Sequence, residues 1–487
     1  RTGRVIIISA IDNLIKGDAP LELIHAHLAR RPTPPDRLMP VLPKRLSAIV
    51  MKLLEKAPEH RYQSAAGLHA DLLELADALA RGAPEPSGPL ASHDRPLSLQ
   101  LPHQLYGRER EQRVLDDELA AVLRDRARHL VVVRGGAGMG KSSLLRGLEA
   151  PLSQRGGYMA IGKFEAQSVD TPYRGIIQAF SSLLEQVLTE SDERLESWRV
   201  RLREALGPVA GVVASSIPEL VLIIGATTLP PELELTESRN RLHLAFGRLL
   251  AGFVSAGPVV FALDDLHWAD PASLDLLGAL VREGSGPVLF VTSLRSHPRH
   301  ASDPSDASGV ALLELASALE RERRRCLRIE LAPIDDASLD RMLADVLGRE
   351  LEQVDALGRY FARKTGKSPF FIRQLLVHLA EGGLIWPEQD RGWGWNLEAI
   401  AGARIPEDVL GMLSAKLERL PPGERALLEL AACVGERFDL ATLEAVELPN
   451  GERLDRDALV ARLHDLGRSG LIDALGQGYQ FAHDRIR

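Results

Sequence analysis

Long apolar runs, cysteine pairs and a strong excess of one charge are all absent from this sequence of 487 residues. No run of about 18 apolar residues occurs, so we expect no membrane span. The two cysteines, Cys326 and Cys433, are too few for a disulfide framework, which predicts a protein of the reducing cytoplasm. Neither cysteine has metal-ligand spacing. The net charge of −8 argues weakly against a main surface that binds nucleic acid.

A methionine start is also missing, because the chain begins with Arg1 and stops at Arg487, partway through an apparent helical motif. We therefore expect a fragment of a longer protein. The apolar stretch at residues 5–11 is too short for the core of a signal peptide, so a core strand or helix is expected there. The length predicts about three domains at roughly 150 residues each.

The most informative segment that is present fits the pattern G-x-x-x-x-G-K-[ST] with no mismatch. Its residues are Gly135, Gly136, Ala137, Gly138, Met139, Gly140, Lys141 and Ser142. A β-branched run at 130–133 precedes it, and a helix-like segment at 143–148 follows, so the context predicts a phosphate-binding loop. The glycines let backbone N–H groups point at phosphate oxygens. The plain alternative is a glycine-rich turn before an ordinary helix.

Each polar group of this loop has an expected role. Lys141 is predicted to reach the β- and γ-phosphates, and the Ser142 hydroxyl to ligate Mg²⁺. Ser143, the next residue, is counted among the nucleotide-binding residues. The predicted cofactors are therefore ATP and Mg²⁺.

An apolar strand at residues 258–265 ends in two carboxylates, as a Walker B element must. Asp264 is expected to hold Mg²⁺ through its water shell, and Asp265 to polarise the attacking water. Because aspartate is shorter than glutamate, we expect slow hydrolysis. The alternative is an Asp pair that caps the helix beginning at Pro271. Arg295 ends the next apolar strand, where it either reaches the γ-phosphate or is a solvated strand-end arginine.

The wider chain alternates β-rich runs with helical segments, which predicts an α/β fold with a parallel sheet covered by helices on both faces. The candidate strands are 130–133, 158–164, 258–263, 287–292 and 326–331. Helices between 171 and 255 form a long insertion between the second and third strands. Near the N-terminus we expect helices near 21–28, 46–54 and 64–79, with Ser64 as the cap of the third, and a linker at 82–102. After the sheet we expect mostly helices at 336–400. The last residues are expected to form helices followed by a hairpin at 471–481, as in a winged helix.

Several segments resemble STAND-type signal-transduction ATPases and origin-recognition-like AAA ATPases, over about residues 103–487. Residues 105–111 fit the hh-G-R-x-x-E element, and residues 263–271 look like the family's extended Walker B. Residues 365–371 resemble its G-N-P-F-F segment, although Lys367 and Ser368 replace Gly and Asn, and residues 481–484 resemble its His-Asp pair. The resemblance implies that the nucleotide is also contacted by Tyr106, Gly107, Arg108, Pro369 and His483.

A second resemblance covers residues 19–80 and is to the end of a bacterial serine/threonine protein kinase C-lobe. It rests on residues 20–29 and 58–65, where Arg61 matches an arginine that pairs with an upstream glutamate in that family. The catalytic kinase motifs are absent, so this segment cannot transfer phosphate. A generic helical bundle is the alternative. The expected domains are a kinase remnant at 1–81, a linker at 82–102, an ATPase core at 103–335, a helical domain at 336–404 and a truncated winged helix at 405–487.

Together these features predict an ATP-binding regulatory switch in a bacterial kinase-type signalling protein. Its expected partners are ATP or ADP and other domains of the same polypeptide or partner proteins, without a membrane; nucleotide-dependent self-association is left open. One alternative is a transcription regulator that binds DNA through the winged helix, although the mixed charges of residues 451–487 argue against nucleic acid as a partner. Another is an interaction scaffold with vestigial nucleotide binding.

Overall fold

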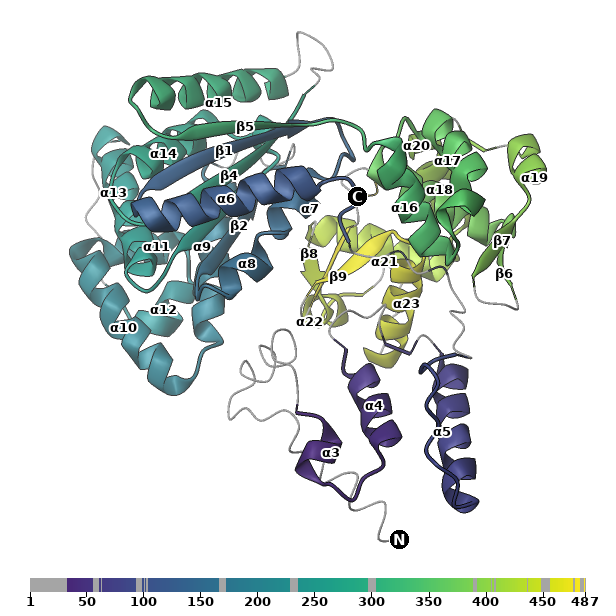
Figure 1. Cartoon of the computed structure of the whole chain (residues 1–487). Helices are drawn as coiled ribbons and strands as arrows, with labels where there is room; N and C mark the ends of the chain where they lie inside the picture. Colours follow the sequence, from purple (N-terminus) through teal and green to yellow (C-terminus); the bar gives the residue numbers. More distant parts are fainter. Residues whose placement is uncertain are drawn as a thin grey trace. The chain divides into compact units, whose positions relative to one another are not determined.

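The computed structural model in Figure 1 divides the chain into two compact units. The first contains residues 1–61, 71–90 and 108–332, and the second contains residues 62–70, 91–107 and 333–487. The residues that the structure describes are 33–55, 61–62, 64–92, 99, 101, 104–165, 172–227, 235–296, 304–388, 392–403, 405–406, 409–435, 437–447, 456–475, 478–481 and 486. The predicted elements at 5–11 and 21–28, and His483, lie outside them.

A five-stranded sheet forms the centre of residues 108–332. Its strands are β1 (Arg128–Gly135), β2 (Tyr158–Lys163), β3 (Val259–Asp264), β4 (Val288–Arg295) and β5 (Cys326–Leu331). Their order is β2-β3-β4-β1-β5, and every neighbouring pair is parallel. The predicted strands and the parallel α/β fold are therefore confirmed. The order places β4 between the strands that end in the glycine loop and in the two carboxylates.

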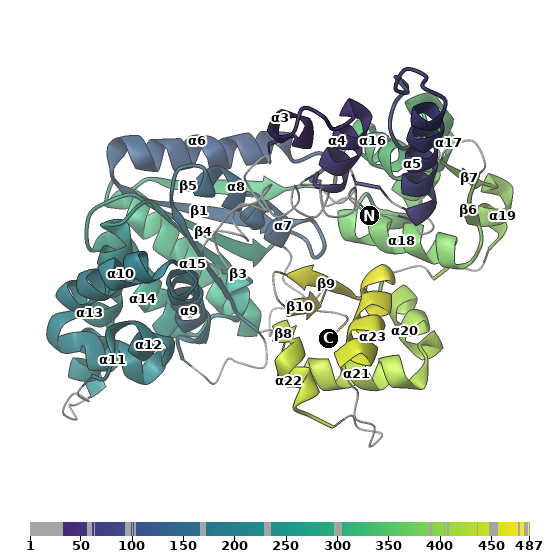
Figure 2. The ribbon, with the colours of Figure 1, turned by 90° about the horizontal axis from the view of Figure 1, so that it is seen from below.

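Helices cover both faces of this sheet, as predicted. Figure 2 shows α6 (Glu109–Asp125) against one face and α14 (Pro271–Arg282) against the other. Because strands covered on both sides need apolar side chains in both directions, β3 is buried along its whole length. The other helices of this sheet are α7 (Lys141–Arg146), α8 (Glu149–Ser153) and α15 (Pro304–Arg321), and η4 (Leu266–Trp268) is a single 3₁₀ turn.

The predicted helical insertion between the second and third strands is confirmed. It contains α9 (Arg174–Leu188), α10 (Asp192–Leu206), η3 (Gly207–Val209), α11 (Ala210–Ser216), α12 (Glu219–Ile224) and α13 (Leu235–Val254). These helices share one hydrophobic core with a face of the sheet, in which Phe180 packs between Phe246 and Phe261 at ring-centroid distances of 5.0 Å. The insertion therefore extends the core of the sheet.

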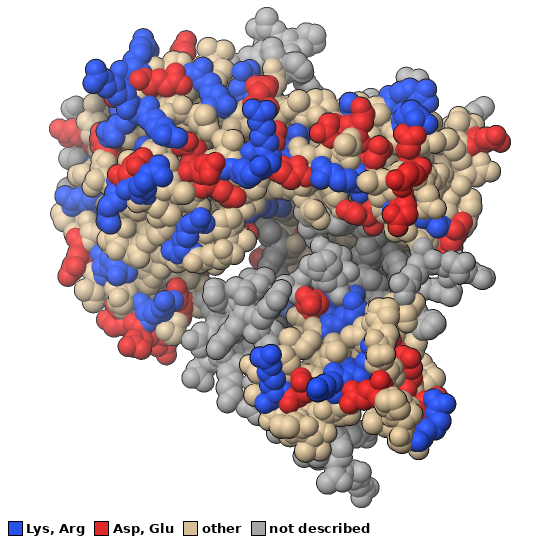
Figure 3. All heavy atoms as spheres, in the orientation of Figure 1, with Lys and Arg blue, Asp and Glu red and all other residues tan. Residues whose placement is uncertain are grey.

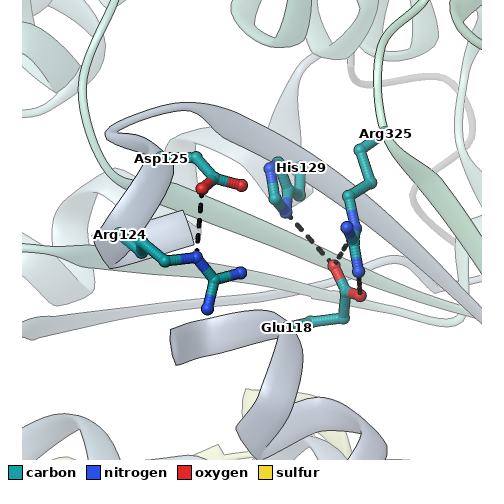
Figure 4. A network of polar contacts seen from close by, with 5 residues as sticks. All are labelled: Glu118, Arg124, Asp125, His129 and Arg325. Carbon is teal, nitrogen blue, oxygen red and sulfur yellow. Dashed lines mark hydrogen bonds and ion pairs between the residues drawn. The ribbon is translucent and has the colours of Figure 1, made fainter. Parts of the chain in front are cut away.

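A buried carboxylate on α6 ties this helix to two strands (Figure 4). Glu118 is 5% exposed, and its Oε2 lies 3.1 Å from Nδ1 of His129 on β1. Arg325, directly before β5, donates from Nε to the same carboxylate at 3.0 Å. These hydrogen bonds raise the pKa of Arg325. The network lies at the amino ends of the strands, opposite the glycine loop.

Four helices and a hairpin of the second unit share a second core. They are α16 (Asp336–Leu347), α17 (Leu351–Thr365), α18 (Pro369–Glu381), β6 (Ile385–Pro387), β7 (Trp393–Trp395) and the short α19 (Leu397–Gly402). β6 pairs with β7 in antiparallel fashion, and Trp393 is 5% exposed, whereas Trp386 is 39% exposed.

The last segment of the second unit combines helices with a small antiparallel sheet. Its helices are α20 (Val409–Arg419), α21 (Pro422–Val434), α22 (Leu440–Glu444) and α23 (Arg456–Arg468), and its strands are β8 (Arg437–Asp439), β9 (Ile472–Leu475) and β10 (Gly478–Phe481). The strand order is β8-β10-β9, and the predicted hairpin of β9 and β10 is present.

The N-terminal segment contains α3 (Pro35–Leu38), α4 (Lys44–Leu53) and α5 (Ala65–Ala80). Ser64 caps α5 as expected, since its Oγ accepts from the Gly67 amide at 3.1 Å. The Glu85 carboxylate, within the expected linker, accepts from the amides of Lys44 at 3.2 Å and Arg45 at 2.7 Å. It thus serves as a remote cap for α4. Arg61 is exposed and donates to the Glu55 carbonyl at 2.7 Å. Among the described helices of both units, none has the length and apolarity to cross a membrane.

Candidate functional site

The glycine loop follows β1 and leads directly into α7. Gly138 and Gly140 have φ values of 74° and 88°, a region that a residue with a Cβ enters only at a cost, and Gly140 is the N-cap of α7. A Cβ on Gly135 would lie 2.9 Å from Cβ of Leu331 on β5, so only glycine fits there. The sequence therefore specifies both the turns of the loop and its close packing on β5.

Lys141 folds back over this loop. Its side chain is 7% exposed, and Nζ donates to the carbonyl oxygens of Gly135 at 3.0 Å and Gly136 at 2.9 Å. Backbone carbonyls are neutral acceptors, and phosphate oxygens are stronger, charged acceptors for an ammonium group. The arrangement holds a cation at the loop where the sequence predicts a phosphate.

The two carboxylates at the end of β3 lie at the same carboxyl edge of the sheet. Asp264 is 8% exposed and Asp265 is 6% exposed. Ser293 on β4 donates its hydroxyl to the Asp264 carboxylate, and its Oγ accepts from the Asp265 amide at 2.9 Å. The Asp265 amide also lies 3.1 Å from Oδ1 of Asp264. These bonds fix the Asp264 carboxylate beside β4, the strand next to β1.

Asp265 adopts a left-handed backbone conformation with a φ of 53°. Non-glycine residues in this region are uncommon, although Asp and Asn are enriched among them. Its carboxylate lies between two basic side chains, with Lys163 Nζ at 3.7 Å and His267 Nδ1 at 3.7 Å. Lys163 is the last residue of β2 and lies opposite Asp264 in the β2–β3 register. The carboxylate is thus held near a cation from the neighbouring strand.

Arg295 is the last residue of β4 and is partly buried. It lies opposite Gly135 in the β1–β4 register, and the following residue, Ser296, donates its amide to the Gly135 carbonyl at 3.3 Å. The structure therefore brings Arg295 to the start of the glycine loop. Contact with a γ-phosphate stays a prediction.

The residues of the G-R-x-x-E element make contacts with protein groups. Tyr106 donates its hydroxyl to Asp345 Oδ2 at 2.9 Å, and Gly107 has a φ of 65°. Arg108 is 4% exposed and donates from Nη2 to the carbonyls of Met139 at 3.1 Å and Ala332 at 2.6 Å. The division between the two units falls between Gly107 and Arg108. The nucleotide contacts implied for these three residues stay predictions.

Pro369 is the first residue of α18, in the second unit. Before it, Gly366 and Lys367 have φ values of 58° and 59°, so the turn forms although Lys367 stands where the resembled family has glycine. The Lys367 amide lies 3.2 Å from Thr365 Oγ1, and Lys367 Nζ lies 3.4 Å from Asp336 Oδ1. These contacts offset the strain of a lysine in the left-handed region.

Two residues beside the carboxylates were not predicted from the sequence: Ser293, which donates to Asp264, and Lys163, whose Nζ lies 3.7 Å from Asp265. A usable signal was present, because each is a polar residue at the carboxyl end of an otherwise apolar strand. The strand order, which the sequence did not reveal, was needed to place them beside β3.

Comparison with known proteins supports this description. Residues 104–291 match the model of the AAA ATPase domain. The chain is 27% identical over 513 residues to the hybrid signal transduction histidine kinase G of Dictyostelium discoideum, which covers 87% of this chain and 14% of that protein. It is 38% identical over 69 residues to the serine/threonine-protein kinase PknB of Mycolicibacterium smegmatis, which covers 14% of this chain and 11% of that protein.

The chain thus spans a small part of the length of these curated relatives. Among solved structures, a STAND protein with a tetratricopeptide repeat sensor from Pyrococcus horikoshii aligns with 78% of this chain and 41% of its own, at 13% identity and a TM-score of 0.40. The family match falls on the glycine loop and the acidic strand, at the residues whose geometry is described above. The similarity to the AAA ATPase domain is confined to residues 104–291.

Proposed function

We propose that residues 104–332 bind ATP with Mg²⁺ and hydrolyse it slowly, and that the bound nucleotide acts as a switch in a signalling protein. One observation carries the proposal. The glycine loop with Lys141 and the carboxylates Asp264 and Asp265 meet at the carboxyl edge of the parallel sheet, with β4 between their two strands. Ligands of open α/β sheets bind at this edge.

The oxygen donors at this edge suit Mg²⁺. The Ser142 hydroxyl follows Lys141 at the start of α7, and the Asp264 carboxylate is fixed by Ser293. Mg²⁺ prefers oxygen ligands and uses one or two protein groups beside waters and phosphates, so it needs no dedicated cage. Accordingly, no group of three or more His, Cys, Asp or Glu that could hold a metal is found among the described residues. Bound Mg²⁺ would neutralise phosphate charge, with Ser142 and Asp264 as its protein ligands.

Asp265 is the group we assign to water activation. Its carboxylate lies near the predicted metal ligand Asp264 and 3.7 Å from Lys163 Nζ. An ammonium ion at this distance is an electrostatic partner of the charged carboxylate. The short aspartate side chain favours slow hydrolysis, which suits a switch that persists in one nucleotide state.

The test measures phosphate release by the wild-type protein and by Asp265→Asn, with ATP binding measured in parallel. Asparagine tolerates the left-handed backbone of this position, so the variant is expected to fold and to bind ATP. Loss of general-base action should lower the release rate by about 100-fold or more. Equal rates in the two proteins would remove Asp265 from the mechanism. ATP binding without any phosphate release would favour the interaction scaffold.

The similarities to a histidine kinase and to a serine/threonine kinase support the proposed role in signalling. We further propose that residues 19–80 are the end of a kinase C-lobe and that the last helices and sheet form a winged helix. On the face shown in Figure 3, acidic and basic side chains are interleaved, which does not favour a nucleic-acid surface. A salt-dependent shift of duplex DNA by the protein would instead favour the DNA-binding regulator.

A further inference from the structure

The side chain of Arg108 connects three parts of the first unit that are distant in sequence. Arg108 directly precedes α6, Met139 lies inside the glycine loop, and Ala332 follows β5. Nη2 of Arg108 donates to the carbonyls of both Met139, at 3.1 Å, and Ala332, at 2.6 Å. Glu111 Oε1, one turn along α6, lies 3.8 Å from Nη1. A buried guanidinium, 4% exposed, thus bonds both the glycine loop and the residue that follows β5.

The bond to Met139 controls a peptide group of the glycine loop. In a trans peptide the C=O and the N–H point to opposite sides, so fixing the Met139 carbonyl also fixes the direction of the Gly140 amide. Gly140 has a φ of 88° and no Cβ to restrict its rotation. Arg108 therefore adds a restraint to this peptide, beside the bond that the Gly140 carbonyl accepts from the Leu144 amide at 2.9 Å.

The bond to Ala332 acts on a connection between the two units. The AAA core of residues 108–332 joins the second unit at the Gly107–Arg108 and Ala332–Pro333 links. Pro333 has no N–H, so the Ala332 carbonyl is the only hydrogen-bonding group in that peptide. Arg108 belongs to one link and holds the carbonyl of the other.

Beyond each link the chain is anchored within the second unit. Tyr106 bonds Asp345, a Cβ on Gly107 would lie 2.9 Å from Ser338 Cβ, and the Ile334 amide donates to the Lys367 carbonyl at 3.2 Å. The backbone freedom between the anchored segments is thus concentrated in the two links. A change in the glycine loop that moves the Met139 carbonyl would be felt at both links through one side chain.

We propose that Arg108 is a positioning residue that couples the glycine loop to the links between the AAA core and the second unit. The coupling rests on the proposed function where it concerns ATP and ADP, whereas the mechanical link to Met139 and Ala332 does not. Arg108 then acts on backbone carbonyls and not on the nucleotide. Each defined residue of the hh-G-R-x-x-E pattern then has a structural role. Gly107 forms the turn, Arg108 bonds the loop and the link, and Glu111 lies beside the Arg108 guanidinium.

The experiment measures amide hydrogen exchange in peptides covering residues 135–142 and 332–338, in the wild-type protein, Arg108→Gln and Arg110→Gln. Arg110 is an exposed arginine on the same helix and serves as the matched control. Without nucleotide, we expect exchange in both peptides to rise together, by about fivefold or more, in Arg108→Gln alone. Exchange that rises in one peptide only, or equally in Arg110→Gln, overturns the proposal.

The same proteins are then compared with ADP and with a slowly hydrolysed ATP analogue. The wild type should show different exchange at 332–338 in the two states, and Arg108→Gln should lose this difference while its affinity for ADP changes by less than about tenfold. Affinity lost as fully as in Lys141→Ala would place Arg108 in the nucleotide site and overturn the proposal. If Arg108→Gln does not fold, Arg108→Lys, which keeps the buried charge, is judged by the same outcomes.

A wild-type protein that binds neither nucleotide would refute the proposed function. The exchange of the nucleotide-free proteins would still decide whether Arg108 links the loop to Ala332. The two failures are therefore distinguishable.

Discussion

The two ends of the same parallel sheet hold buried charges in different ways. At the amino end, Glu118 lies 3.1 Å from His129 and 3.0 Å from Arg325, and Arg128 donates from one nitrogen to the carbonyls of Leu280 and Glu283. At the carboxyl end, Lys141 also makes hydrogen bonds, to backbone carbonyls at 2.9 and 3.0 Å, whereas the contacts of Asp265 with Lys163 and His267 are both 3.7 Å long. The contacts of Asp265 have the distances of loose ion pairs, and the others have hydrogen-bond distances.

This difference separates a structural role from a ligand-binding role. Charged groups in direct hydrogen bonds hold elements of the fold together. The protein loses stability if one of the partners is removed or displaced. Charges in longer contacts can exchange one partner for another at lower cost. At the carboxyl end, Lys141 is bonded to neutral carbonyls, which a charged phosphate can replace, and the contacts of Asp265 are long, whereas Glu118 at the amino end is bonded directly to a charged partner, Arg325.

Among the substitutions that test this difference between the two ends, we expect the largest effect on stability at Glu118. Glu118→Gln keeps the size of the side chain but removes the charge shared by Arg325 and His129. We expect the free energy of unfolding of the AAA core to fall by about 2 kcal/mol, the usual value for hydrogen bonds to a charged group, with unchanged ATP affinity. Denaturant unfolding and ATP titration measure both quantities. Asp117→Asn, an exposed neighbour on α6, is the control. A loss of affinity without a loss of stability would reverse the roles of the two ends.

A smaller effect is expected at Ser293, which donates to Asp264 at the carboxyl end. Ser293→Ala removes one donor from the predicted metal ligand, so the affinity for Mg²⁺-ATP should fall about five- to tenfold, or about 1 kcal/mol. The control is Thr292→Val, which removes a neighbouring buried hydroxyl that donates to the Val131 carbonyl at 3.3 Å. Isothermal titration of both variants checks the prediction. An equal loss of affinity in both would mean that general strand packing, and not the carboxylate contact, is responsible.

The smallest expected effect concerns Cys326, at the start of β5. Burial raises the pKa of its thiol to about 11. At pH 8 such a thiol is roughly 0.1% thiolate, so it should react slowly with iodoacetamide and faster as the pH rises toward 11. Mass spectrometry of the alkylated protein should find the exposed Cys433 modified first. Rapid labelling of Cys326 at pH 8 would show that the amino end of the sheet opens more readily than its packing indicates.

The fold was largely predictable because its strands are apolar runs and its loop is a complete motif. β3 is buried along its whole length, so its sequence is continuously apolar up to Asp264. The order of the strands was not predictable from these runs, because each run fits equally well beside several neighbours. The position of β4 between β1 and β3 depends on how the strands and helices pack in the tertiary structure.

The candidate site was predictable only where its residues lie within motifs. Lys141, Asp264 and Asp265 were found because the loop and the acidic strand are each continuous in sequence. Lys163 and Ser293 were missed because they approach the carboxylates through strand neighbours. For Arg108, the nucleotide contact implied by the family resemblance stays a prediction. The hydrogen bonds of its guanidinium to the Met139 and Ala332 carbonyls join segments that are distant in sequence, so they could not be predicted from it.

We propose above that the carboxyl edge of the sheet binds a nucleoside triphosphate through Lys141. Titration of a fluorescent ATP analogue into the wild-type protein, Lys141→Ala and the control Lys364→Ala tests it most directly. Lys364 also donates to a backbone carbonyl, that of Ile405 at 3.2 Å, but lies outside the residues that match the AAA ATPase domain. We expect about 10- to 100-fold weaker binding for Lys141→Ala alone. Equal affinity in all three proteins would contradict it.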